Sequence, residues 1–190
     1  RWYTCGLYEQ KYHGIVYCAL GWACWKTYLG RPEENQLRCL AMMQLGNGLS
    51  AAGHYKDALS VREADLSSLR RLGAPEYNIV VLQTNLANSY QRLGRLDEAL
   101  RTRQDVYSGK VKLRGEEHES TLLEATNYAS SLVDLQRYAE AKSLLRKWMP
   151  VVRRVLGESN QLTLGMRDTY AEALYSIRTT ARRSMISARP

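Results

Sequence analysis

The sequence lacks any long apolar run. No stretch approaches the roughly 20 consecutive apolar residues of a membrane-spanning helix, and the first 30 residues hold no apolar core of a secretion signal. The chain also begins with Arg1 instead of methionine. We therefore expect a cytoplasmic segment of a larger protein, without a membrane partner.

Motifs for catalysis are also missing. The histidines His13, His54 and His118 lie far apart, and none belongs to a zinc-protease, serine-hydrolase or phosphate-binding motif. The acidic pair Glu116–Glu117 is typical of a solvated turn. We therefore expect no enzyme activity and no small-molecule substrate.

The net charge of +8 is located at the two ends of the chain. Residues 1–31 carry four basic and one acidic residue, and residues 146–190 carry nine basic and three acidic residues. The middle, 32–145, has fourteen basic and fifteen acidic residues. A nucleic-acid-binding protein would more often have a continuous basic stripe, so this distribution disfavours that partner and indicates ends that contact an acidic one.

What the sequence does contain is an internal repeat of about 42 residues. The first landmark series is a glycine in a polar turn, at Gly30, Gly73, Gly115 and Gly157, with spacings of 43, 42 and 42. The second is a small residue, at Ala58, Ala99 and Ala141, with spacings of 41 and 42. Two independent series with one period indicate a solenoid of stacked units.

Each period predicts two amphipathic helices. In the first, the apolar and small residues Leu82, Leu86 and Tyr90 recur at every fourth position, and the pattern stops at Gly94. The second begins near Asp97, whose carboxylate suits a helix N-terminus. The alanines fit the close contact of two antiparallel helices, where a larger side chain would not pack.

The stretch "TNLANSYQRLGRLDEAL" at 84–100 resembles the tetratricopeptide repeat (TPR), in its long kinesin light chain and nephrocystin variety. The matching residues are Asn85, Leu86, Ala87, Tyr90, Gly94, Arg95, Glu98 and Ala99. The departures are Gly46 and Leu49 at the small and aromatic positions of the first repeat, Gln136 in place of the turn glycine, and Glu119 in place of a proline. The resemblance implies an all-α, right-handed superhelix of antiparallel helix pairs, a TPR-like solenoid.

The repeats divide the chain into three parts. Residues 1–34 form a segment rich in cysteine and aromatic residues that ends in a capping helix at 14–29. Its packed side is expected to carry Val16, Leu20, Ala23/Cys24 and Leu29. Residues 35–177 hold the repeats, at 35–75, 76–117, 118–159 and a partial 160–177. Residues 178–190 form a basic tail that we expect to fray. Pro150 should kink or break the helix at 138–156 near Trp148.

The resemblance also implies a concave groove lined by the first helix of each pair. Amides there can donate to and accept from the main chain of an extended peptide, and Arg92 could pair with an acidic one. The alternative is that these amides brace neighbouring helices. The candidate groove residues are Met43, Asn47, Thr84, Asn85, Asn88, Gln91, Arg92, Thr126, Asn127 and Ser130.

The stretch "CGLYEQKYHGIVYC" at 5–18 has the spacing of a zinc knuckle with Tyr8 in place of one cysteine. A structural zinc needs four ligands, and Cys5, His13 and Cys18 supply three. Cys24 could complete the set, although it lies inside the expected capping helix. The alternative is that Cys18 and Cys24 are small buried residues of that helix, and no cofactor is then required.

These features predict a non-catalytic scaffold that binds a peptide or protein segment in the groove of its repeats. A zinc-assisted nucleic-acid adaptor, using the N-terminal Cys/His segment and the basic tail, is the alternative function. An oligomerisation scaffold is a third.

Overall fold

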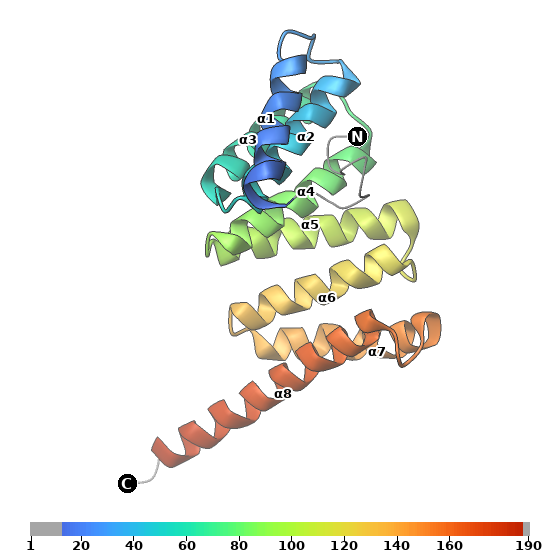
Figure 1. Cartoon of the computed structure of the whole chain (residues 1–190). Helices are drawn as coiled ribbons and strands as arrows, with labels where there is room; N and C mark the ends of the chain where they lie inside the picture. Colours follow the sequence, from blue (N-terminus) through green and yellow to red (C-terminus); the bar gives the residue numbers. More distant parts are fainter. Residues whose placement is uncertain (1–12, 188–190) are drawn as a thin grey trace. The chain divides into compact units, whose positions relative to one another are not determined.

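The computed structural model describes residues 13–187, except for the side chains of residue 181 and of residues 183–187. Eight α-helices make up all the regular secondary structure of these residues. Figure 1 shows how they are arranged within each part of the chain. They are α1 (Gly14–Tyr28), α2 (Gln36–Ala51), α3 (Tyr55–Arg71), α4 (Glu76–Arg92), α5 (Leu96–Arg114), α6 (Glu119–Asp134), α7 (Tyr138–Leu156) and α8 (Gln161–Ser187). The all-α prediction is confirmed. Within this part of the chain, no helix combines the length and apolarity needed to cross a membrane.

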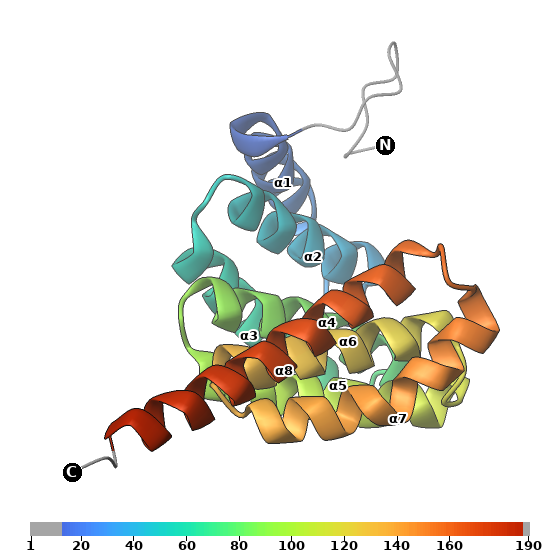
Figure 2. The same cartoon turned by 90° about the horizontal axis from the view of Figure 1, so that it is seen from below.

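The chain divides into two compact units between Arg95 and Leu96. In unit 1, each of the helices α1 to α4 packs against the next. In unit 2, α5 to α8 do the same, and α8 also packs against α6 and extends past it (Figure 2). Because the turns between consecutive helices are short, consecutive helices run antiparallel within each unit.

The turn between the two helices of a repeat requires a left-handed backbone. Gly53 and Gly94 adopt it with φ of 85° and 71°. Gln136 occupies the equivalent position in the third repeat, 42 residues after Gly94, and adopts φ of 59°. A side chain with a Cβ is strained in this conformation, whereas glycine is not.

Replacing Gln136 by glycine is therefore expected to raise the free energy of unfolding by about 0.5–1 kcal/mol, because relief of the strain exceeds the added freedom of the unfolded chain. Urea denaturation followed by circular dichroism measures this change. The reciprocal variant Gly94→Gln should lower stability. If Gln136→Gly proves destabilising, the turn does not impose strain.

The landmark alanines are buried as predicted, with Ala58 and Ala141 fully inaccessible and Ala99 1% exposed. The expected break at Pro150 is wrong, because α7 is helical from Tyr138 to Leu156 with the proline inside it. Trp148 and Val152, on either side of the proline, are 1% and 0% exposed in the main core of unit 2. Burial of these side chains offsets the missing backbone hydrogen bond and keeps the helix continuous.

The capping helix exists, but the predicted packed side is wrong in part. Val16 and Leu29 are 54% and 53% exposed, whereas Cys18, Gly21 and Cys24 are buried. The reason is a close crossing of α1 and α2. A Cβ added at Gly21 would lie 2.9 Å from the carbonyl oxygen of Gln44, so the backbones approach each other through glycine. Small residues, and not the largest apolar ones, therefore define this contact.

The C-terminal helix is longer than expected. The predicted helix ended near residue 177, followed by a fraying tail, but α8 continues to Ser187. Among the residues of α8 whose side chains are described, the buried apolar ones are Met166 and Ala173. The helix continues beyond them into the basic segment, where the sequence predicted a fraying tail.

Candidate peptide-binding groove

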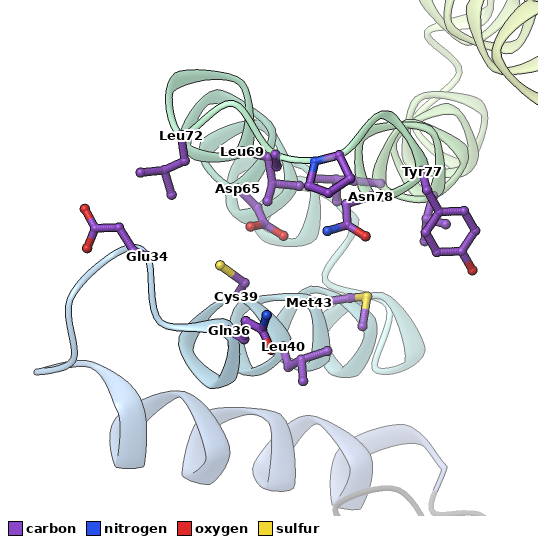
Figure 3. A pocket seen from close by; sticks show the side chains of 14 residues that line it. Glu34, Gln36, Cys39, Leu40, Met43, Asp65, Leu69, Leu72, Tyr77 and Asn78 are labelled. Atoms are coloured by element: carbon purple, nitrogen blue, oxygen red, sulfur yellow. The ribbon is translucent and has the colours of Figure 1, made fainter. Parts of the chain in front are cut away.

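Two open pockets lie beside α2 and α4 in unit 1. The first has a volume of about 650 Å³ and is bounded by α2, the end of α3 and the beginning of α4 (Figure 3). Its lining residues are Glu34, Gln36, Cys39, Leu40, Met43, Asp65, Leu69, Leu72, Ala74, Pro75, Tyr77, Asn78, Val81 and Leu82. The second pocket measures about 690 Å³ and is lined by Ser50, Arg62, Asn88, Gln91 and Arg92.

Helix packing explains why there is space here. In unit 2, α8 packs closely against α6, the first helix of the preceding repeat. In unit 1, α4 packs against α3. The two pockets lie between α4 and α2. The first helices of two successive repeats therefore form the walls of an open groove.

A buried arginine holds the walls of this groove in place. Arg62 of α3 is 6% exposed, and its guanidinium donates to the Asn47 side-chain oxygen at 3.0 Å and to the Asn85 carbonyl at 3.3 Å. It also donates to the hydroxyl of Ser89. Burial lowers the pKa of Arg62 from its ordinary value, opposed by the nearby Tyr17. One side chain thus connects α2 with α4.

The structure divides the predicted groove residues of unit 1 into two groups. Met43 lines the first pocket, and Asn88, Gln91 and Arg92 line the second. The side-chain oxygen of Asn47 instead accepts from Arg62, which is the bracing role left open as the alternative. Asn85 offers Arg62 only its backbone carbonyl, so the role of the Asn85 side chain stays a prediction.

The Thr84 hydroxyl donates to the Val80 carbonyl within α4 at 2.9 Å. This bond stays within one helix, so the role of Thr84 in binding stays a prediction.

The three predicted residues of unit 2 lie together on α6. The Thr126 hydroxyl donates to the carbonyl of Leu122 at 3.0 Å. Asn127 and Ser130 are half-buried, and the Asn127 carbonyl accepts from Ser131 at 3.1 Å. Their role in binding stays a prediction.

The sequence interpretation missed Asp65. This residue of α3 is 5% exposed and lines the first pocket, where its carboxylate points into the space between α3 and α2 (Figure 3). Among the described residues, no hydrogen bond or ion pair reaches this carboxylate. The equivalent positions in the next two repeats, 41 and 83 residues later, hold Val106 and Trp148. The sequence signal that could have revealed Asp65 is an acidic residue at a position where the next two repeats carry apolar residues.

Burial raises the pKa of Asp65 from 3.8 to about 6. The cause is desolvation, because removal from water disfavours the charged carboxylate. The neighbouring Cys39 thiol also has a raised pKa, first from burial and then from the negative charge of Asp65. Both groups therefore favour their neutral forms more than they would in water.

Unit 2 contains a buried acid in a different environment. Glu124 of α6 is fully inaccessible and accepts from Arg103 at 3.1 Å and from Lys110 at 3.0 Å. Both cations come from α5. Here the fold supplies two positive charges to one buried carboxylate, as burial of a charge requires.

The zinc candidates are only partly within the described residues, since Cys5 lies outside them. Cys18 and Cys24 are 9% and 3% exposed and are buried on α1. Desolvation raises the pKa of Cys24, which disfavours the thiolate that metals bind. Within residues 13–187, no three His, Cys, Asp or Glu side chains come together as a metal site would require. Packing accounts for Cys18 and Cys24, and zinc binding by the whole stretch stays a prediction.

A family model described as tetratricopeptide repeat matches residues 80–104, which form most of α4 and the beginning of α5. The matched residues include the stretch in which the resemblance is strongest. No curated protein sequence matches the chain significantly.

Solved structures show the same fold over most of the chain. The nearly identical TPR-like repeats of a putative kinesin light chain from Podosopora anserina align with a TM-score of 0.76 and 18% identity, over 88% of this chain and 81% of that one. A variant of those repeats gives 0.77, at 18% identity, over 88% and 80%. BtubC (BKLC) from P. vanneervenii gives 0.68 and 16% identity, over 84% and 65%. The TPR-like, kinesin light chain-like resemblance and the solenoid fold are confirmed.

Proposed function

We propose that this chain is a non-catalytic interaction scaffold that binds an extended peptide segment of a partner protein along the first helices of its repeats. The observation that carries the proposal is the groove between α2 and α4, where the two pockets are open to solvent. Solenoids of helix pairs commonly use such surfaces to bind other proteins. The TPR-like fold supports the same general role.

The second pocket supplies polar chemistry suited to a peptide main chain. Asn88 is exposed and Gln91 half-exposed, so their amides line the groove from one wall. Arg92 is exposed too, with its guanidinium 6.0 Å from the ring centre of Tyr55. Amides that donate and accept would bind backbone groups with little sequence preference, while Arg92 would favour an acidic residue nearby.

The test is selection from a displayed library of random peptides on the purified chain, followed by affinity measurement with the recovered peptides. The double variant Asn88→Ala with Gln91→Ala is expected to weaken binding about ten-fold or more, because two amides that line the second pocket are lost to the peptide. Its melting temperature should not fall. Gln104→Ala, which removes an exposed amide from α5, is the matched control and should bind as the unmodified chain does.

Two results would contradict the proposal. One is recovery of no specific peptide by the unmodified chain. The other is equal binding by the double variant and the Gln104 control, which would place recognition outside the first helices.

A further inference from the structure

The first pocket combines apolar walls with one buried negative charge. Leu40, Met43, Leu69 and Leu82 form the walls. The Asp65 carboxylate faces the pocket (Figure 3). Glu34 adds a second acid from the loop before α2. None of the fourteen lining residues shown in Figure 3 is lysine, arginine or histidine. The pocket therefore has negative charge and no basic side chain of its own to balance it.

The rest of the chain shows that the fold does not need this acid. The equivalent position holds Val106 in the second repeat and Trp148 in the third, and both are buried at 0–1% exposure. Where the chain buries another acid, Glu124, it provides Arg103 and Lys110 within 3.1 Å. Asp65 is thus a buried carboxylate whose counter-charge is not supplied by the described residues.

Groups on each neighbouring element leave the carboxylate uncompensated. On α3 itself, the guanidinium of Arg62 is engaged with Asn47 and Ser89. Among the residues that line the pocket, the titratable group of α2 is the Cys39 thiol and that of α4 is the phenol of Tyr77, which is half-exposed. None of these groups brings a positive charge to the Asp65 carboxylate.

The dimensions and chemistry of the pocket fit a basic side chain. A volume of about 650 Å³ admits a long side chain together with part of the adjoining peptide. The methylenes of lysine or arginine would contact the leucines and Met43, as such stems do on apolar surfaces. The terminal cation would reach the carboxylate and form a charge-assisted hydrogen bond.

We infer that the first pocket binds a lysine or arginine side chain, flanked by apolar residues, of the peptide partner, with Asp65 as its counter-ion. This inference rests on the proposed function, since it names the partner residue that one part of the groove selects. Above pH 6 the carboxylate is ionised and binds the cation, and binding should weaken as the pH falls below 6.

A small probe tests the pocket independently of any peptide. We would titrate the full chain at pH 7.5 with n-hexylammonium, and separately with 1-hexanol as its uncharged counterpart. Amide chemical shifts of Cys39, Met43 and Leu82 report binding. The ammonium is expected to bind about ten-fold more tightly than the alcohol. That preference should vanish in Asp65→Asn and persist in Asp57→Asn, which neutralises an exposed acid of the same helix.

Equal affinity for the two probes, or no shift with either, would overturn the inference. So would an ammonium preference that survives in Asp65→Asn. The melting temperature of Asp65→Asn, which should not fall, shows that any loss of binding is not caused by unfolding.

Peptides from the library selection provide a second test of the inference. They are expected to share a basic residue between apolar ones, and changing that residue to norleucine should cost about ten-fold in affinity on the unmodified chain but little on Asp65→Asn. Specific peptides without a shared basic residue would overturn the inference while the proposed function stands. If no peptide is recovered but hexylammonium still binds, the proposed function and the inference are both refuted. The first pocket would then be a site for free organic amines.

Discussion

Replacing Glu124 by alanine is expected to lower the free energy of unfolding by about 3–5 kcal/mol. The Glu124 carboxylate is inaccessible and is the partner of both Arg103 and Lys110 in unit 2. Its removal leaves these two cations in a desolvated site without the charge that offsets their burial. Chemical denaturation followed by circular dichroism measures the change.

An exposed ion pair provides the control for this prediction. Arg137 and Glu140 lie 2.7 Å apart, but their side chains are 45% and 56% exposed. Glu140→Ala should therefore cost less than about 1 kcal/mol. Similar losses for the two variants would mean that Glu124 is not buried with its partners as described.

Replacing Asp65 by asparagine is expected to have the opposite effect and to raise stability at pH 7.5 by about 2–3 kcal/mol. The folded-state pKa of about 6 lies above the unfolded value of 3.8, so the folded state binds the proton more tightly. Above pH 6 the unmodified chain carries the cost of a buried charge, and this cost disappears as the pH falls from 6 towards 4. The variant lacks the charge at every pH.

The measurement is thermal or urea denaturation of both chains from pH 4 to pH 7.5. The stability difference should be largest at pH 7.5 and small at pH 4, because Asp65 is then protonated. Asp57→Asn, on the same helix but exposed, should give no gain. A variant less stable than the unmodified chain at pH 7.5 would show that the Asp65 carboxylate has a stabilising partner.

Together, the two predictions distinguish a structural acid from a functional one. Glu124 stabilises the fold because its partners belong to the chain. Asp65 costs stability, and such a cost is common where a residue is retained for binding. If Asp65 is a binding residue, Asp65→Asn should be more stable than the unmodified chain and should no longer prefer the cationic probe.

The sequence predicted those parts of the fold that repeat. The turn glycines and the small residues at Ala58, Ala99 and Ala141 recur with one period, so helix positions and core contacts could be inferred from any one repeat. Departures from this period were harder to predict from the sequence. The α1 contact depends on Gly21 and Gly48, where a missing Cβ allows the backbones to approach, and apolar periodicity does not detect this.

The candidate site was predicted only in part for a related reason. Met43 and Asn88 were predicted to face the groove because they lie on first helices, and each lines one of the pockets. The repeat pattern did not reveal that Arg62 from α3 binds Asn47. That contact joins residues 15 positions apart, and it depends on how α3 packs against α2. Asp65 was overlooked because it sits on a second helix, whose residues were assigned to the core.

The proposed function requires that a partner peptide lies in the groove between α2 and α4. The most direct test is to add a library-selected peptide to the isotopically labelled chain and record every backbone amide shift. The largest changes should fall on α2 and α4, at Met43, Asn88 and Gln91. Changes confined to exposed positions of α3, such as Lys56 and Ser67, would contradict it.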